Sequence, residues 1–364
     1  MAGRPPKKHG AWGEASSGKR SDQGDGRLAC EIALFDDLDA AARDAGDALG
    51  REAQPSLFDR LDWFRLVQEH TPEGTPLVVR VRHGQGRCWL FLSVRGSCAR
   101  ALTNWYSLRY GPVVDGGTSS GAPLDELARG LRQAGIGQLI LAPIEGKGEI
   151  AVALRRKGWA TSRSQVTVSW QIDTRGMSFD DYWAGRSSQL RNTTARRARK
   201  AKLELVVHDR FDEQGWLDYE AIYAASWKPE EGSPPLMRQL AEQEGAAGTL
   251  RLGLAYRDGR PVAAQLWLIE NGTATIHKLA YREDARDLSP GTVLTMEMFR
   301  RALDVDRVDM IDFGVGDEPY KADWMTHSVP LYALTAYDML RPAGIAGIVR
   351  SVCWKLARLR RGGS

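Results

Sequence analysis

Apolar and polar positions repeat one order of elements twice along the chain: three antiparallel strands, a loop, a helix and a further strand. In the first half the strands are predicted at 77–82, 88–94, 101–108, 138–144 and 165–172, and the helices at 123–133 and 148–157. In the second half the strands are predicted at 250–256, 261–269, 273–281, 307–313 and 330–338, with a helix from Ser289 or Pro290 to about Asp304. The pattern therefore predicts an α+β fold of two tandem domains, each a mixed, mainly antiparallel sheet flanked by helices.

The turns of the second half give the strongest local signals. Asp258-Gly259 and Asn271-Gly272 each stand between two apolar runs. Such dipeptides favour tight hairpin turns, because both residues readily adopt a positive φ. We therefore expect the strands between 250 and 281 to pair consecutively as a meander.

Charge and composition divide the chain into four parts. Residues 1–27 are rich in Gly, Ser, Pro and charged residues, and we expect a disordered basic leader. The first domain is placed at 28–172, the second at 173–340, and a basic helix or tail at 341–364. The leader carries a net charge of +3 and the tail a net charge of +6. Because the whole chain carries +4, the body between them carries −5. A duplex-binding domain usually carries a basic face on its own fold, so a nucleic-acid partner is unexpected.

Composition also excludes several classes of protein. The chain is 43% hydrophobic and 26% charged, which is ordinary for a globular protein and excludes wholesale disorder. No apolar run approaches the roughly 20 residues of a membrane span, and the start lacks the apolar core of a secretory signal. The four cysteines stand singly, without the spacing of a zinc site. We expect no metal, no disulfide framework and a cytoplasmic location.

Two basic segments have more than one interpretation. The helical segment 186–202 holds seven Lys or Arg residues and no acid. It is suited to the phosphates of a cofactor or an RNA acceptor stem, or it is a solvated face that pairs with acids elsewhere. The segment 341–361 predicts a short basic helix, which can contact an anionic membrane surface or pack on the body through its apolar side, including Val349.

A first candidate site is the start of the helix in the second half. Ser289 is suited to the N-cap, and Pro290 to the first helical position, where its missing N–H is not needed. Gly291 has no side chain and Thr292 follows it, so the N–H groups of the first turn stay accessible. N–H groups and the helix dipole both favour a phosphate there. The alternative is a helix cap without a ligand.

A second candidate site follows the strand 307–313. The run 311–324 holds two glycines, four acids, a tyrosine, a lysine and a tryptophan in fourteen residues. Loops at strand ends carry functional side chains more often than sheet interiors do. The alternative is a polar turn beneath which the tyrosine and tryptophan pack.

Together these motifs resemble the GNAT-type acyltransferases, and more narrowly their FemAB-like, tandem-domain branch, often labelled CelD-like. The resemblance covers roughly residues 50–340. Three segments carry it: SPGTVL at 289–294, DFGVGDEPYKADW at 312–324 and RSSQLRNTTARRARKA at 186–201. It implies two tandem GNAT-like domains and an N-acyltransferase that moves an acyl group, most simply acetyl, from acyl-CoA to an amine.

The resemblance also implies where the donor lies. The pyrophosphate of coenzyme A is expected at the helix start, near Ser289, Pro290, Gly291 and Thr292. The pantetheine arm is expected along the strand 273–281, which includes Leu279.

For the chemistry, the resemblance implies a general base, an oxyanion site and a proton donor to the leaving thiolate. Asp312 is the preferred base or amine-orienting group, and His277 is the alternative base. Tyr320 is the candidate proton donor, and Lys321 is a candidate donor to phosphate or to the acceptor.

One departure from the resemblance keeps alternatives open. The glycine-rich pyrophosphate loop of ordinary acetyltransferases is absent, and REDARDLSPG (282–291) stands in its place, with acids that would repel a polyphosphate unless they point away. A FemAB-type transferase that uses aminoacyl-tRNA is one alternative, although 202–212 leaves no room for the long helical arm of such enzymes. A non-catalytic GNAT module that binds a membrane or an acidic partner is the other. The first repeat lacks a counterpart of 312–324, so we expect it to help form an acceptor cleft between the domains.

Overall fold

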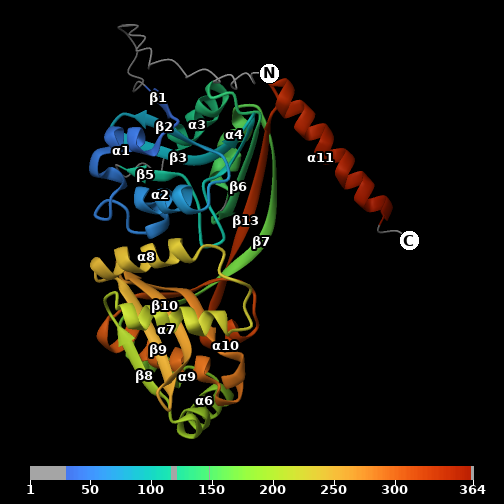
Figure 1. Ribbon diagram of the computed structural model, residues 1–364. Coiled ribbons are helices and arrows are strands. Elements are labelled where there is room, and N and C mark those ends of the chain that lie inside the picture. The colour runs from blue at the N-terminus through green and yellow to red at the C-terminus, as the bar shows by residue number, and fades with distance from the viewer. Residues whose placement is uncertain (1–29, 116–120, 147, 362–364) are drawn as a thin grey trace, which may run out of the picture.

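The computed structural model describes residues 30–115, 121–146 and 148–361 (Figure 1). The predicted leader 1–27 lies outside the described residues. The strands are β1 Cys30–Phe35, β2 Thr75–His83, β3 Gly86–Arg95, β4 Cys98–Ala101, β5 Val113–Asp115, β6 Gln138–Ile144, β7 Trp159–Asp173, β8 Glu204–His208, β9 Leu250–Arg257, β10 Arg260–Glu270, β11 Thr273–Tyr281, β12 Met310–Val315 and β13 His327–Asp338. The α-helices are α1 Leu38–Ala45, α2 Leu61–His70, α3 Gly121–Gln133, α4 Glu149–Arg156, α5 Phe179–Ala184, α6 Ser188–Ala201, α7 Glu213–Ala224, α8 Pro234–Ala246, α9 Pro290–Arg300, α10 Tyr320–Trp324 and α11 Pro342–Arg361. The α+β class is therefore confirmed.

The described strands form one sheet that runs through both halves. Its order is β1-β2-β3-β4-β6-β13-β7-β12-β11-β10-β9-β8, and β5 pairs with β3. Only β4 with β6 and β11 with β12 are parallel among these pairs, as a repeated unit requires. The meander β9–β11 is confirmed, with Asp258 and Asn271 at positive φ in its two turns.

The two halves exchange their last long strands. By sequence position β7 ends the first half and β13 ends the second. In the structure β13 pairs with β6 of the first half, and β7 pairs with β12 of the second half. The two strands also pair with each other, from His327 with Gln171 to Asp338 with Trp159. The division at 172/173 stays a prediction, because the sheet continues across it.

Most predicted strands are found, but the one predicted at 101–108 is wrong. Strand β4 ends at Ala101, and the following residues form a loop. There the Asn104 side chain accepts a hydrogen bond from the Tyr106 N–H at 3.0 Å, and the Ser107 hydroxyl accepts one from the Asn104 N–H at 3.1 Å. These local bonds replace the ladder bonds that a strand needs.

Helices cover both faces of the second-half sheet. Helices α9 and α6 lie on one face, over a core that includes Ile276, Phe299 and Phe313. Helices α7 and α8 cover the other face and share a continuous core with the first half. Figure 1 shows α8 between the two lobes. The second-half site residues are thereby held against the first half.

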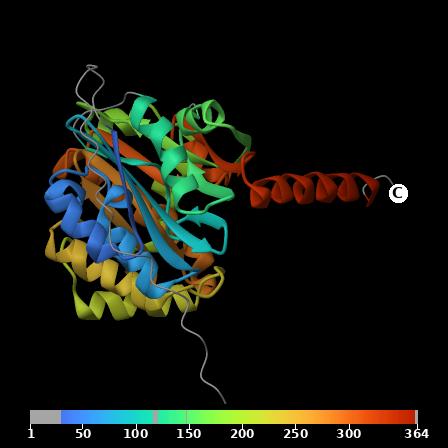
Figure 2. The same cartoon turned by 90° about the horizontal axis from the view of Figure 1, so that it is seen from above.

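Helix α11 extends away from the body in both views (Figures 1 and 2). Val349 is 55% exposed, so the expectation that it packs on the body is wrong. No helix in the described ranges is long and apolar enough to cross a membrane. Peripheral membrane contact through this helix stays a prediction.

Candidate active site between the two halves

The parallel strands β11 and β12 pair only at their beginnings. Thr273–Thr275 align with Met310–Asp312, and the strands separate after these residues. A cleft of about 610 Å³ lies at the separation. Its lining residues come from the segments 105–108, 223–232, 276–279, 313–315 and 318–321. The first half thus supplies one wall of the cleft and the second half the others.

A β-bulge in β11 determines which side chains enter the cleft. Leu266 of β10 pairs with Lys278 and the next residue, Trp267, pairs with Ile276, which leaves His277 as the extra residue. A bulge interrupts the alternation of a strand and redirects its side chains. Consequently Ile276, His277 and Lys278 are all buried, although they are consecutive.

His277 has one hydrogen-bonded ring nitrogen and one without a partner. Its Nε2 lies 3.2 Å from the carbonyl oxygen of Tyr106, and a carbonyl can only accept, so Nε2 is the donor. Nδ1 therefore carries a lone pair, and it has no partner among the described residues. The side chain is only 7% exposed. Burial, followed by the charge of Lys278, lowers the pKa of His277 to about 3, so the imidazole is neutral at physiological pH.

Next to His277, a buried ion pair connects three segments of the chain. The Lys278 ammonium, 7% exposed, lies 2.8 Å from a carboxylate oxygen of Glu231, which precedes α8. The hydroxyls of Tyr106 and Tyr219 donate to the same carboxylate at 2.8 and 3.2 Å. The Tyr106 hydroxyl in turn accepts the Ser233 N–H at 2.7 Å. The network holds the loop of the first half against β11 and the α7–α8 connection.

The opposite wall is the turn that leads into α10. Lys321 is 4% exposed, and its ammonium donates to the Val315 carbonyl at 2.7 Å and pairs with Glu318 at 3.0 Å. Gly316 has φ of 124°, and a Cβ there would lie 2.3 Å from a Glu318 oxygen, so this turn requires glycine. The Tyr320 ring packs edge-on against Phe313. Burial, with the nearby Glu318 carboxylate, raises the pKa of Tyr320, so its hydroxyl stays protonated.

The start of α9 lies close to the cleft without lining it. Ser289 occupies the N-cap and Pro290 the first helical position, as predicted, although the Ser289 side chain makes no capping bond. A Cβ on Gly291 would lie 3.2 Å from the Tyr281 ring, and that ring lies 4.2 Å from the ring of Trp227, a lining residue. The two rings therefore connect the first turn of α9 to the cleft.

Two of the three acids before α9 are paired with arginines, which weakens the objection that they repel phosphate. Asp284 pairs with Arg260 at 2.7 Å and with Arg282 at 3.1 Å. Glu283 pairs with Arg286 at 3.5 Å. Basic helix α6 packs against the 3-10 helix Glu283–Leu288, which holds these acids, and against α9. The ion-pair contacts of the described residues include none between its Lys and Arg side chains and an acid, so the solvated-pair interpretation is not supported.

The comparisons with known proteins agree with this geometry. Residues 185–322 match the family model of an acetyltransferase (GNAT) domain. The structure of FemX is 12% identical, with a TM-score of 0.54 over 76% of this chain and 95% of that chain. A conserved protein of unknown function from Bacteroides thetaiotaomicron is 14% identical, with a TM-score of 0.54 over 84% of this chain and 100% of that chain.

The segment 185–322 is therefore similar to a GNAT domain. The fold of the chain as a whole is similar to that of FemX. The C-terminal domain of a putative lysylphosphatidylglycerol synthetase from Agrobacterium fabrum is also similar, with 13% identity and a TM-score of 0.51 over 73% of this chain and 85% of that chain. No curated protein matches the sequence at a significant level. The GNAT fold supports N-acyl transfer as the class of reaction.

Within this GNAT cleft the structure brings together four of the predicted site residues: His277, Leu279, Tyr320 and Lys321. Asp312 is not among the lining residues. Its carboxylate accepts hydrogen bonds from the Ser169 hydroxyl at 2.6 Å, the Gln171 amide at 3.0 Å and the Gly314 N–H at 2.8 Å. These bonds attach β12 to β7 and fix the turn at Gly314. A catalytic role for Asp312 stays a prediction, and the contacts favour a structural role.

Sequence reasoning missed the residues that the first half and the α7–α8 connection contribute. Tyr106, Lys228 and Glu231 follow no motif, and Tyr106 lies in a segment predicted as a strand. The available signal was weak: a tyrosine and tryptophan in a loop with Asn and Ser, and a Lys-Pro-Glu-Glu run before Gly-Ser-Pro-Pro.

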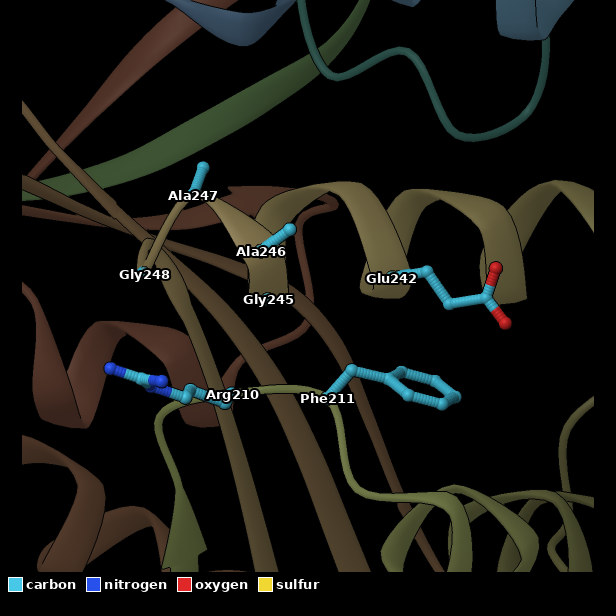
Figure 3. A pocket seen from close by; sticks show the side chains of 7 residues that line it. All are labelled: Arg210, Phe211, Glu242, Gly245, Ala246, Ala247 and Gly248. Atoms are coloured by element: carbon cyan, nitrogen blue, oxygen red, sulfur yellow. The ribbon is translucent and has the colours of Figure 1, made fainter.

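A second hollow lies away from these residues, between the end of α8 and the loop after β8 (Figure 3). A Cβ on Gly245 would lie 2.5 Å from the Phe211 nitrogen, so close backbone approach forms this hollow. Arg210 and Glu242 are its ionisable lining residues, and in Figure 3 their side chains lie on opposite sides. We assign it no ligand.

Proposed function

We propose that the protein transfers an acyl group from acyl-CoA to an amine in the cleft between β11 and β12. The observation that carries the proposal is the separation of these parallel strands directly beside the start of α9. The unpaired edge of β11 offers backbone groups to the amides of a pantetheine arm. The first turn of α9 and the neighbouring basic helix α6 suit the phosphates.

The remaining residues suit the chemistry of acyl transfer. The amine nitrogen attacks the thioester carbon, a C–N bond forms, the C–S bond breaks, and a proton of the amine ends on the thiolate. The free Nδ1 lone pair of His277 accepts a hydrogen bond from the amine and orients it. Tyr320, which stays protonated, delivers a proton to the thiolate and regains one from the amine.

Thr292→Glu tests the position of the donor phosphates. A negative charge in the first turn of a helix interacts favourably with the helix dipole, so the variant should unfold no more easily than the wild type. The same charge repels phosphate, and the dissociation constant for acetyl-CoA should rise about tenfold or more, equivalent to about 1.4 kcal/mol. Titration calorimetry measures the affinity, and Thr292→Gln is the uncharged control. Equal affinity in both variants would place the phosphates elsewhere.

Tyr320→Phe tests the proton donor. Loss of the hydroxyl should lower turnover about 100-fold, the usual size of a general-acid contribution, with little change in acetyl-CoA affinity. Tyr332→Phe is the matched control, because it removes a hydroxyl from a half-buried tyrosine of β13 that does not line the cleft. Similar rates for both variants would show that Tyr320 transfers no proton.

Aminoacyl transfer from tRNA is the second candidate, favoured by the unpaired basic side chains of α6 and by the likeness to FemX. Filter binding of aminoacyl-tRNA at 50 and 200 mM salt distinguishes it, since phosphate contacts weaken steeply as salt rises. Tight, salt-sensitive binding together with no measurable acetyl-CoA binding would favour this candidate over acyl-CoA.

A further inference from the structure

Three lysines line the cleft, and two of them already have counter-charges within the protein. Lys278 pairs with Glu231, and Lys321 pairs with Glu318 and donates to the Val315 carbonyl. The third, Lys228, is half-buried on the α7–α8 connection. Among the described residues its ammonium has no ion pair or hydrogen bond, and its nearest recorded interaction is with the Trp227 ring, at 5.9 Å from the ring centroid.

An ammonium in this position favours an anion that comes from outside the protein. Removing a charge from water costs free energy unless an opposite charge compensates it. Burial, and then the neighbouring ammonium of Lys278, lowers the pKa of Lys228 to about 8. A bound anion would offset both effects, and it would also interact with the ammoniums of Lys278 and Lys321.

The place of Lys228 points to the acceptor rather than the donor. Its charged neighbours are Lys278, Glu318 and Lys321, which line the cleft, and Glu231, which pairs with Lys278. Lys278 is adjacent to His277, the residue proposed to orient the amine. The donor phosphates, by contrast, are assigned to the start of α9, and the packed rings of Trp227 and Tyr281 lie between that helix start and Lys228.

We propose that Lys228 binds an acidic group of the acceptor, so that the substrate is an amine that also carries a carboxylate or a phosphate. This inference rests on the proposed acyl transfer. Trp105, 82% exposed at the same cleft, offers an apolar surface to the body of such a substrate.

Matched pairs of amines test the inference with acetyl-CoA as donor: glycine against glycinamide, and glucosamine 6-phosphate against glucosamine. In the wild type, at least one acidic member should have a kcat/KM about tenfold or more above that of its neutral partner. Lys228→Gln should abolish this preference by raising KM for the acidic member, with kcat and acetyl-CoA affinity unchanged. Lys228→Arg should restore part of the preference, and Lys157→Gln, at the end of α4 and outside the cleft lining, should behave as wild type.

The other outcomes count against the inference. A preference for both neutral members, or an acid preference that survives in Lys228→Gln, overturns it. A rise in the acetyl-CoA dissociation constant of Lys228→Gln would assign the lysine to the donor instead. Calorimetric titration of the same amines into the wild-type protein with bound coenzyme A separates a failure of this inference from a failure of the proposed function. If the wild type does not bind acetyl-CoA, acyl-CoA transfer itself is rejected. If it binds coenzyme A but neither acidic amine, the role of Lys228 is rejected.

Discussion

Glu231→Gln is expected to lower the free energy of unfolding by about 3 to 5 kcal/mol, because it leaves a buried ammonium without its counter-charge. Lys278 and the Glu231 carboxylate are 2.8 Å apart and almost fully buried, and two tyrosine hydroxyls donate to the same carboxylate. The loss of stability cannot exceed the cost of deprotonating Lys278, and neutralising an ordinary lysine at pH 7 costs about 4.6 kcal/mol. Urea denaturation followed by tryptophan fluorescence measures the loss.

Two further variants show that the loss comes from the pair itself. Glu230→Gln removes the same charge from the neighbouring exposed residue and should cost less than about 0.5 kcal/mol. The double variant Glu231→Gln, Lys278→Met should be more stable than Glu231→Gln alone, because it removes the stranded ammonium. If the loss of stability in the double variant instead equals the sum of the losses caused by Glu231→Gln and Lys278→Met alone, the pair makes no coupled contribution.

Acid should destabilise the protein through His277. The pKa of this imidazole is about 3 in the folded state and near 6.5 when unfolded. Below pH 6.5 the unfolded chain binds a proton that the folded chain does not, so the stability present at neutral pH is lost as the pH falls toward 3. The loss reaches about 2 kcal/mol at pH 5 and approaches about 5 kcal/mol at pH 3.

The comparison with His277→Gln isolates this contribution, because glutamine does not titrate. The difference in unfolding free energy between wild type and variant should change by about 2 kcal/mol, to the disadvantage of the wild type, between pH 7.5 and pH 5. Urea denaturation at several pH values gives the slope. If this difference stays constant across the range, the imidazole of His277 has the same pKa in the folded protein as in the unfolded chain.

The sequence predicted the repeated fold well because its signals are local. Hairpin turns such as Asp258-Gly259, and the alternation along β9–β11, depend on neighbouring residues alone. The exchange of β7 and β13 was not predictable in the same way. The apolar alternation of each strand is the same whichever strand it pairs with, and pairing between residues more than 150 positions apart leaves no local signal in the sequence.

The candidate site was predictable where one segment carries it. The helix start at Ser289 and the run that includes Tyr320 and Lys321 are continuous in the chain, and both lie at or beside the cleft. Asp312 was the preferred base because a carboxylate at a strand end suits that role. Its three hydrogen bonds come from β7 and from its own turn, which only the folded sheet brings together. The acceptor wall of Tyr106, Lys228 and Glu231 likewise exists only after the halves meet.

The exchanged strand β13 has a consequence for synthesis of the protein. On the ribosome, β6 and β7 emerge long before residues 327–338, yet each needs that last strand along one edge. The nascent chain therefore carries open strand edges on β6 and β7 until residues 327–338 have been made, and such edges invite aggregation. A message cut short before codon 327 would yield a polypeptide that cannot close its sheet. Closure of the first-half sheet therefore depends on synthesis of the second half through residue 338.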